Sequence, residues 1–398
     1  MGYMTTTEPR SLPAGAPGLG PGPGPALAAS GGPVVSTMGV EEEFLLVDRL
    51  TRAPVARADP VIRAASYPLG ELVQSEFYRC MVETCTRPTA DVGDLRDQLR
   101  HLRATVAEAA RASHCLLVAS GTPVVAPAAP IPVTDTPRYR RMARHFGALV
   151  DGRLGIVCGC HIHVGTADRA QALYLANHVR PWLPALQALA VNSPFAGGLD
   201  TGFSSWRALE FGRWPTAGPA PLLDPASYEE TAEALVSSGI LLDRRMIYWF
   251  ARPSEHQPTI EFRVTDSNAD LDTTLLVALL LRGLCATFLA GADEDRPPPD
   301  VSVARLSAAH RCAARYGAGG FALDPFTGDC IPAQTLIAAL VRAAGPGLRA
   351  AGDEAEVDRL LDALRRKGTG ADRQRAALDR SGRLRYVVDG LADLTRSA

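Results

Sequence analysis

The amino-acid sequence predicts an α+β fold in which an antiparallel sheet is followed by a helical C-terminal part. Segments with strand-like and helix-like spacing follow one another without a regular βαβ repeat, which argues against a parallel sheet. With 398 residues, of which 46% are hydrophobic, the chain can bury a large core. Beyond about residue 330 every periodic segment is helical. We therefore expect an α+β domain over residues 36–330 and a helical subdomain packed on it over residues 331–398.

Residues 1–35 are rich in Gly, Pro, Ala and Thr, as in the stretch GLGPGPGPALAASGGP. Such a composition buries too little apolar surface to offset the entropy lost on ordering, so we expect a disordered tail. Structure should begin near Val34, where VVSTMGVEEEFLLVD has the pattern of a strand that ends in a loop at Asp48.

The remaining elements are predicted from hydrophobic spacing. Apolar residues at alternate positions indicate a strand, and apolar residues three and four apart indicate a helix. We expect strands at residues 80–85, 115–120, 156–164, 245–250 and 259–264. We expect helices at residues 94–112, 170–190, 271–289, 301–316, 333–344, 354–366, 372–380 and 384–394.

Composition excludes several partners and chemistries. The formal net charge of -2 and the pI near 6.5 provide no field that would bind nucleic acid or an anionic membrane, so we expect neither as a partner. Of the 41 basic residues only Lys367 is a lysine, which excludes a Walker lysine and a mid-chain Schiff-base lysine. Any phosphate must therefore be bound by arginine and metal ions.

The expected compartment is the cytoplasm. The eight cysteines contain no C-x-x-C pair, and reduced, mostly buried thiols are the ordinary expectation in a chain of this size. The apolar segment 275–291 is interrupted by Arg282, which favours a core helix over a membrane span. The first residues lack the charged and apolar regions of a signal peptide.

Four strand segments each carry charged or imidazole side chains on one face and apolar side chains on the other. Side chains alternate across a strand, so residues two apart share a face. In CGCHIHVG, His161 and His163 share one face, whereas Cys158 and Cys160 lie on the apolar face. The same alternation in GVEEEFLLV, MVETC and TIEFRV assigns to the polar faces Glu41, Glu43, Glu83, Glu261 and Arg263.

Acids gathered on one surface repel one another unless a cation binds there. A solvated sheet face is the ordinary explanation for one such strand, but four strands together favour a binding site. Carboxylates favour a hard cation such as Mg²⁺ or Mn²⁺, and Mn²⁺ also tolerates an imidazole. Zinc is disfavoured because four or more carboxylates exceed the needs of a tetrahedral site.

Two further stretches have the composition of functional loops. Residues 192–221 are rich in Gly, Pro and Ser and carry Asp200, Arg207 and Arg213, which is typical of a loop or lid. In KGTGADRQR two glycines and a threonine precede Arg373 and Arg375 at a predicted helix start, where an anion could bind. Taken by itself, this second stretch is better explained as an ordinary connection between helices.

Six motifs, in chain order, resemble the carboxylate–amine ligase group of the type 2 glutamate–cysteine ligases. They are GVEEEFLLVD, SEFYRCMVET, CGCHIHVG, the block NSPF…DTGFSSWR…WPTAGP, TIEFRVTD and GTGADRQR. The resemblance extends from about Met38 to the C-terminus. It implies a glutamine synthetase-like fold, in which a bent antiparallel sheet has helices on its outer face and binds ATP, divalent metal ions and an acidic substrate on its concave face.

The resemblance also implies roles for individual residues. The metal-binding acids would be Glu41, Glu43, Glu76, Glu83 and Glu261, with His161 on a metal or a phosphate. Arg207 and Arg263 match arginines that contact the transferred phosphoryl group or the substrate carboxylate. We assign His163 to the catalytic group, and Arg373 and Arg375 to nucleotide binding.

The implied activity is the ATP-dependent joining of a carboxylate to an amine through an acyl phosphate, with Mg²⁺ or Mn²⁺ as cofactor. The substrates would be small molecules, as in the glutamate–cysteine ligase reaction, and a homodimer is suggested by analogy alone. Two alternatives stay open at this point. One is a metal-dependent hydrolase that uses His161 and His163, and the other is a catalytically silent binding member of the same fold.

Overall fold

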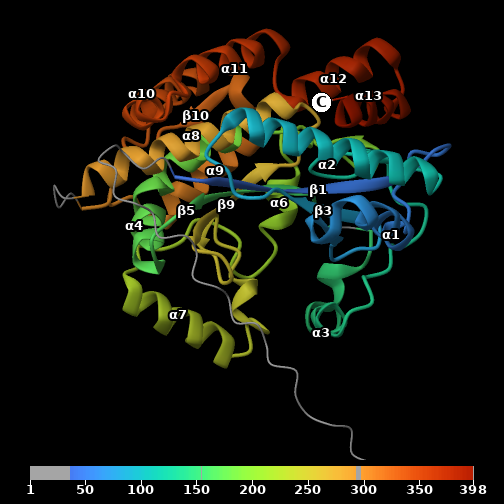
Figure 1. Cartoon of the computed structure of the whole chain (residues 1–398), viewed down its shortest axis with the longest axis horizontal. Coiled ribbons are helices and arrows are strands. Elements are labelled where there is room, and N and C mark those ends of the chain that lie inside the picture. Colours follow the sequence, from blue (N-terminus) through green and yellow to red (C-terminus); the bar gives the residue numbers. More distant parts are fainter. Residues whose placement is uncertain (1–35, 154, 293–296, 398) are drawn as a thin grey trace, which may run out of the picture. The chain divides into compact units, whose positions relative to one another are not determined.

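The computed structural model describes residues 36–153, 155–292 and 297–397 (Figure 1). The predicted disordered tail, residues 1–35, lies outside the described residues. The strands are β1 (Met38–Asp48), β2 (Val73–Ser75), β3 (Met81–Cys85), β4 (Cys115–Val118), β5 (Gly159–Gly165), β6 (Phe195–Ala196), β7 (Leu199–Asp200), β8 (Ala251–Pro253), β9 (Thr259–Asp266), β10 (Phe321–Leu323) and β11 (Cys330–Pro332).

Helices cover most of the remaining described chain. They are α1 (Ala58–Leu69), α2 (Val92–Ala112), α3 (Pro137–Phe146), α4 (Arg169–Val179), α5 (Leu183–Leu189), α6 (Arg207–Phe211), α7 (Pro225–Ser237), α8 (Leu271–Ala290), α9 (Val303–Tyr316), α10 (Ala333–Ala351), α11 (Glu354–Lys367), α12 (Gly370–Ser381) and α13 (Leu384–Ser397). Most predicted helices are therefore present, with ends displaced by a few residues.

The central sheet is antiparallel throughout and follows the order β2-β3-β1-β5-β9-β8, with β4 also paired to β1. β1 lies near its middle because it pairs with β3, β4 and β5 along different parts of its length. Figure 1 shows α2 and α8 along one face of this sheet and α3 and α7 on the other side. The two faces therefore have different surroundings.

The face toward α2 and α8 is the apolar one. Val40 of β1 and Ile162 of β5 are buried in one hydrophobic cluster with Leu99 of α2 and Leu275 of α8. Cys160 belongs to the same cluster, as strand alternation predicted. Burial of such side chains provides the main stabilisation of the sheet against its helices.

One charged residue of β1, Glu42, points into this apolar layer and is fully buried. Its carboxylate accepts hydrogen bonds from Nε and Nη2 of Arg103, at 2.9 and 2.5 Å, and from the hydroxyl of Thr274 at 3.1 Å. Arg103 in turn donates to the backbone oxygens of Asn268 and Ala269. The pair therefore joins β1, α2 and the segment that leads into α8.

Two elements differ from the sequence prediction. The helix predicted at residues 170–190 is divided into α4 and α5, because Pro181 and Pro184 lack the N–H that a continuous helix requires. The strand predicted at residues 245–250 is absent, and the strand in this region, β8, begins at Ala251. The preceding segment bonds to the loop instead: the Thr216 hydroxyl donates to the Met246 oxygen at 2.6 Å.

The C-terminal helices pack on the core from the side of α8. α10 contacts α8 closely enough that a Cβ on Gly347 would lie 2.1 Å from the backbone oxygen of Gly283. α8 is long and apolar enough to cross a membrane, but 72% of its most apolar window is buried inside the protein, as predicted for a core helix. The assignment of residues 331–398 to a separate subdomain stays a prediction.

Replacement of Arg103 by methionine should lower the free energy of unfolding by roughly 3–5 kcal/mol, because it leaves the Glu42 carboxylate buried without its charged partner. Chemical denaturation monitored by circular dichroism measures the change. The matched control is Arg111→Met on the same helix, where the arginine is exposed and lies 3.6 Å from the exposed Glu108. Equal losses for the two variants would contradict a special role for the buried pair.

Candidate active site

The polar face of the sheet forms the floor of a cavity of about 520 Å³. Acidic, basic and aromatic side chains line it together. They include Glu41, Glu43, Glu76, Glu83, Tyr139, His161, His163, Arg207, Tyr248, Arg252, Glu261 and Arg263. Every predicted catalytic residue and every predicted metal ligand therefore lies in one cavity.

Strand register explains how distant segments meet there. Glu41 of β1 is directly opposite His161 of β5, and Glu43 is opposite Glu83 of β3. Opposed residues in an antiparallel pair share a face, so each match brings two polar side chains together. His163 is opposite Glu261 of β9 in the same way.

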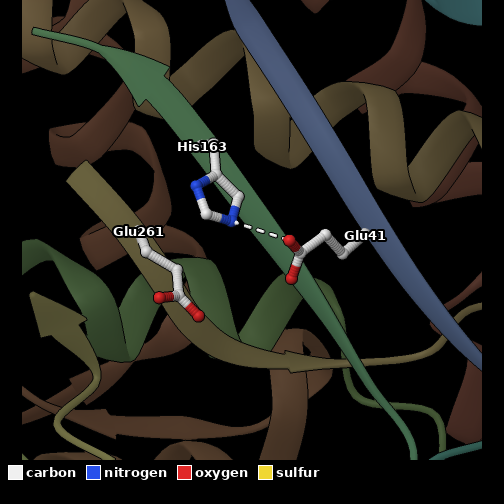
Figure 2. A group of neighbouring side chains, drawn as sticks. All are labelled: Glu41, His163 and Glu261. Carbon is white, nitrogen blue, oxygen red and sulfur yellow. Dashed lines mark ion pairs between the residues drawn. The ribbon is translucent and has the colours of Figure 1, made fainter. Parts of the chain in front are cut away.

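Figure 2 shows the centre of this face, where Glu41, His163 and Glu261 converge from β1, β5 and β9. His163 Nε2 lies 3.4 Å from one carboxylate oxygen of Glu41, and His161 Nδ1 lies 3.3 Å from the other. His161 Nδ1 is also 3.9 Å from a Glu261 oxygen. Glu41 therefore lies between two imidazoles.

Three acids in the cavity have pKa values above the ordinary range of a glutamate. Burial, followed by the charge of Glu76, raises the pKa of Glu43 to about 8. Burial also raises the pKa of Glu83 well above its ordinary value, with further increases from Glu41, Glu76 and Glu43. Burial raises the pKa of Glu76. These carboxylates can ionise together only if a cation binds among them.

Two other acids are ionised by their neighbours. Burial by itself would raise the pKa of Glu41, but hydrogen bonds and charges from His161 and His163 outweigh it and lower the pKa below the ordinary range. For Glu261 the charges of Arg263 and Arg252 likewise outweigh burial and lower the pKa. The cavity thus holds permanent anions beside acids that can lose their protons.

The donor set fits a hard divalent cation. Ligand atoms of Glu41, His163 and Glu261 lie within 4.8 Å of one another, as do those of Glu41, Glu83 and His161. Burial and the charge of Arg263 lower the pKa of His161 to about 4, so its imidazole is neutral at pH 7, as a metal ligand must be. Burial by itself would lower the pKa of His163, but its contact with the Glu41 carboxylate outweighs burial and raises that pKa, so this imidazole must give up a proton when it binds a metal ion. Each of these two clusters, Glu41 with His163 and Glu261 and Glu41 with Glu83 and His161, could hold Mg²⁺ or Mn²⁺.

Arg207 and Arg263 supply the positive side of the cavity. Both are buried or nearly so, and Nε of each lacks a hydrogen-bond partner. Arg263 forms an ion pair with Glu261. Arg207 has no carboxylate within 4.0 Å among the residues that the structure describes. Buried guanidinium groups with unmet donors are suited to bind an anion such as a phosphate.

Gly159 makes room for Arg207. A Cβ at this position would lie 2.3 Å from Nη2 of Arg207, so any other residue would displace the guanidinium. The Gly159 N–H also donates to a Glu43 oxygen at 2.5 Å. One glycine at the start of β5 therefore positions both an arginine and an acid.

The structure does not bring Arg373 and Arg375 to this cavity. Arg375 forms a two-pronged contact with Asp200 at 2.9 Å for both pairs of atoms. Arg373 donates to the Gly368 oxygen and lies 3.3 Å from Asp270. The helix start before them is capped internally, because Thr369 and Asp372 form a capping box. Their assignment to nucleotide binding has no support in this geometry.

Several cavity residues were missed from the sequence. Arg252 is the second residue of β8, whereas the strand in this region was predicted at residues 245–250 and ended before it. Its guanidinium pairs with Glu261 at 3.0 Å. Tyr139 of α3 donates its hydroxyl hydrogen to a Glu76 oxygen at 3.0 Å. Tyr248 lines the cavity from the irregular segment before β8. A strand placed to end at Pro253 would have put Arg252 opposite Glu261.

The cavity combines acids for cations with arginines for anions on the face of an antiparallel sheet, an arrangement suited to phosphoryl transfer from a metal-bound nucleotide. The chain belongs to glutamate–cysteine ligase family 2 (GCS2), which it matches over residues 37–390. It is thus a member of a family of carbon–nitrogen ligases, and the resemblance drawn from the six motifs is confirmed.

Curated relatives are similar over nearly the whole chain. A Nocardia farcinica (strain IFM 10152) protein provisionally named glutamate–cysteine ligase 2-1 is 45% identical over 339 residues, which cover 85% of this chain and 88% of the relative. A Salinispora arenicola (strain CNS-205) protein provisionally named glutamate–cysteine ligase 2 is 44% identical over 365 residues, 91% of this chain and 96% of the relative.

Two solved structures share the fold at low identity. The glutamate–cysteine ligase of Francisella tularensis, in complex with AMP, has a TM-score of 0.71 at 13% identity and covers 91% of this chain and 89% of its own. A bifunctional glutathione synthetase from Pasteurella multocida has a TM-score of 0.67 at 16% identity, and the match covers 91% of this chain but 52% of that protein. The predicted fold class is thereby confirmed.

Without metal ions, the protein should become less stable as the pH rises from about 6.5 to about 8. The folded protein binds more protons at Glu43 than the unfolded chain does over this range, and the raised pKa of Glu83 acts in the same direction, so stability falls with pH. His161, whose pKa falls on folding from its ordinary 6.5 to about 4, opposes this trend only near pH 6.5, where the unfolded imidazole still binds part of a proton. Thermal unfolding in EDTA measures the slope, and Mg²⁺ or Mn²⁺ should restore more stability at pH 8 than at pH 6.5. A melting temperature that rises with pH in EDTA would contradict the assigned pKa shifts.

Separate substitutions of His161 and Cys160, which are adjacent on β5, test which face of the strand binds metal. His161→Ala should weaken Mn²⁺ binding at least about tenfold, or about 1.4 kcal/mol, because it removes an imidazole from the acid cluster. Cys160→Ala should leave the affinity nearly unchanged, since the thiol packs in the apolar layer. Isothermal titration calorimetry with Mn²⁺ compares the two, and equal losses would disprove the assignment of the faces.

Proposed function

We propose that this protein is an ATP-dependent glutamate–cysteine ligase. It would join the side-chain carboxylate of L-glutamate to the amine of L-cysteine and convert ATP to ADP and phosphate. Family membership supports a ligase of this type, and the names of the curated relatives support these two substrates. The Francisella tularensis structure contains AMP, so an adenine nucleotide is compatible with the fold.

The proposal rests on one observation: the same cavity contains carboxylates that lack a cation and guanidinium groups that lack an anion. Glu43 and Glu83 cannot ionise together without a cation, and Arg207 and Arg263 have buried donors without partners. A complex of ATP with divalent metal ions supplies cations and anions at once. A hydrolase would need the metal but would leave the arginines unexplained.

The chemistry explains why a phosphoryl donor is needed. A carboxylate does not react with an amine because its oxygen is a poor leaving group. Transfer of the γ-phosphoryl group to the glutamate carboxylate forms an acyl phosphate and releases ADP. The amine then attacks the acyl carbon, the C–N bond forms, and phosphate leaves with the former carboxylate oxygen. The amine loses a proton to a base as the C–N bond forms.

The residues of the cavity would divide this work by charge. Arg207 and Arg263 would bind the transferred phosphoryl group and balance the charge on its oxygens. Glu41, Glu43, Glu83, His161, His163 and Glu261 would hold the metal ions. Bound Mg²⁺ or Mn²⁺ would neutralise the phosphates and orient them. Glu76, bonded to Tyr139, would support this set from the cavity wall.

Purified protein supplied with ATP, Mg²⁺, L-glutamate and L-cysteine should release ADP only when the amine is present. Glu41→Gln should lower kcat/KM on the order of 10²-fold or more, because it removes the anion that lies between two imidazoles. A coupled assay for ADP measures both rates.

The matched control is Glu108→Gln, an exposed glutamate on α2. It should keep the activity of the unmodified protein. ATP-independent hydrolysis of a substrate would favour a hydrolase, and tight binding of glutamate without any turnover would favour a silent binding member. Either result would overturn the proposed ligase. Assembly as a homodimer and a cytoplasmic location stay predictions.

A further inference from the structure

Arg252 has donor groups that no residue of the described chain satisfies. The residue is 8% exposed and lines the cavity from β8, at the edge of the sheet. Its Nη2 lies 3.0 Å from a Glu261 oxygen. Its Nε and Nη1 are buried and have no hydrogen-bond partner. Leaving donors of a charged group unmet inside a protein is costly, so these atoms point to a missing anionic ligand.

The charges around Glu261 also indicate that an anionic ligand is missing at Arg252. Arg252 contacts one oxygen of the Glu261 carboxylate and Arg263 contacts the other. One negative charge thus serves two arginines, and within the described residues no further carboxylate lies within 4.0 Å of Arg252. The edge of the cavity at β8 therefore has an excess of positive charge.

Position decides which anion fits. Glu43 and Glu83 lie on β1 and β3, whereas Arg252 lies on β8, the edge strand that β5 and β9 separate from β1. Phosphates coordinated by metal ions at Glu41, Glu43 and Glu83 would lie over β1 and β3, and Glu261, the one proposed metal ligand that contacts Arg252, has one carboxylate oxygen on each of Arg252 and Arg263. Arg252 is separated from Arg263 by one carboxylate group, and a short dicarboxylic acid has two anionic groups separated by a few carbon atoms.

We propose that Arg252 determines specificity by binding the carboxylate that does not react, the α-carboxylate of a glutamate-like dicarboxylic amino acid. Arg263 and Arg207 would then face the carboxylate that receives the phosphoryl group. A guanidinium presents N–H donors on several edges in a fixed plane, so Arg252 can keep Glu261 on one edge and bind the substrate on another. This inference rests on the proposed ligase function.

The test compares two donors that differ only in the group that Arg252 would bind. L-Glutamate has the α-carboxylate, and 4-aminobutanoate lacks it. With ATP, Mg²⁺ and L-cysteine saturating, Arg252→Met should lower kcat/KM for glutamate roughly 10- to 100-fold, mainly through KM, as expected for loss of a charge-assisted hydrogen bond. The same variant should change kcat/KM for 4-aminobutanoate by less than about threefold. The kcat/KM of Arg252→Lys for glutamate should lie between those of the unmodified protein and Arg252→Met, because lysine keeps the charge and loses the planar set of donors.

Arg245→Met is the matched control, because this arginine also lines the cavity but is exposed. It should change the rates for both donors by the same factor, so the ratio between donors stays that of the unmodified protein. Equal losses for both donors with Arg252→Met would overturn the proposal and indicate that Arg252 only supports Glu261. A changed ratio between cysteine and cysteamine, with the donor ratio unchanged, would overturn it in favour of the carboxylate of the amine substrate.

Direct binding separates this inference from the ligase activity. Isothermal titration calorimetry with Mg²⁺ and a non-hydrolysable ATP analogue should show glutamate binding that Arg252→Met weakens by a factor similar to that in KM. If the unmodified protein shows no turnover but retains this binding difference, the proposed function fails and the role of Arg252 stands. If turnover is present and the variant binds glutamate normally, the role of Arg252 fails and the ligase stands.

Discussion

The candidate active site depends on the mutual repulsion of carboxylates that β1, β3 and β9 bring to one face of the sheet. Glu43 and Glu83 are directly opposed across β1 and β3; burial raises the pKa of both carboxyl groups, and the charge of Glu43 raises the pKa of Glu83 further. Such a face is stable only with protons or with cations. The imidazoles and guanidinium groups that surround these acids are therefore part of the same electrostatic balance, and removal of one group alters the protonation of the rest.

The apolar face fixes the geometry that this balance requires. A shift of β1 by one residue would turn Glu41 and Glu43 toward the apolar layer and Glu42 toward the cavity. The buried contact between Glu42 and Arg103 opposes such a shift, because the carboxylate finds its charged partner in only one register. The ionic pair in the core and the acids in the cavity thus depend on the same strand alignment.

Strand alternation predicted which side chains share a face, because that property is local to each segment. It separated His161 and His163 from Cys160 correctly, and the structure places the thiol in the apolar layer. The order of the strands was not predictable in this way, since pairing depends on contacts between segments far apart in the chain. Arg252 was missed because β8 has three residues, too few for a periodic pattern. The six motifs supplied the fold class, which periodicity alone left at an antiparallel α+β arrangement.

The positive groups of the cavity are arginines, and the one lysine of the chain, Lys367, lies outside the lining and 3.3 Å from Asp270. An acyl phosphate is an electrophile that acylates amines, and the ammonium of a lysine loses its proton to become such an amine far more readily than a guanidinium does. A cavity lined by arginine therefore offers no side-chain amine to compete with the amine substrate. The composition that excluded lysine chemistry at the outset would also protect the protein from acylation by the proposed acyl phosphate.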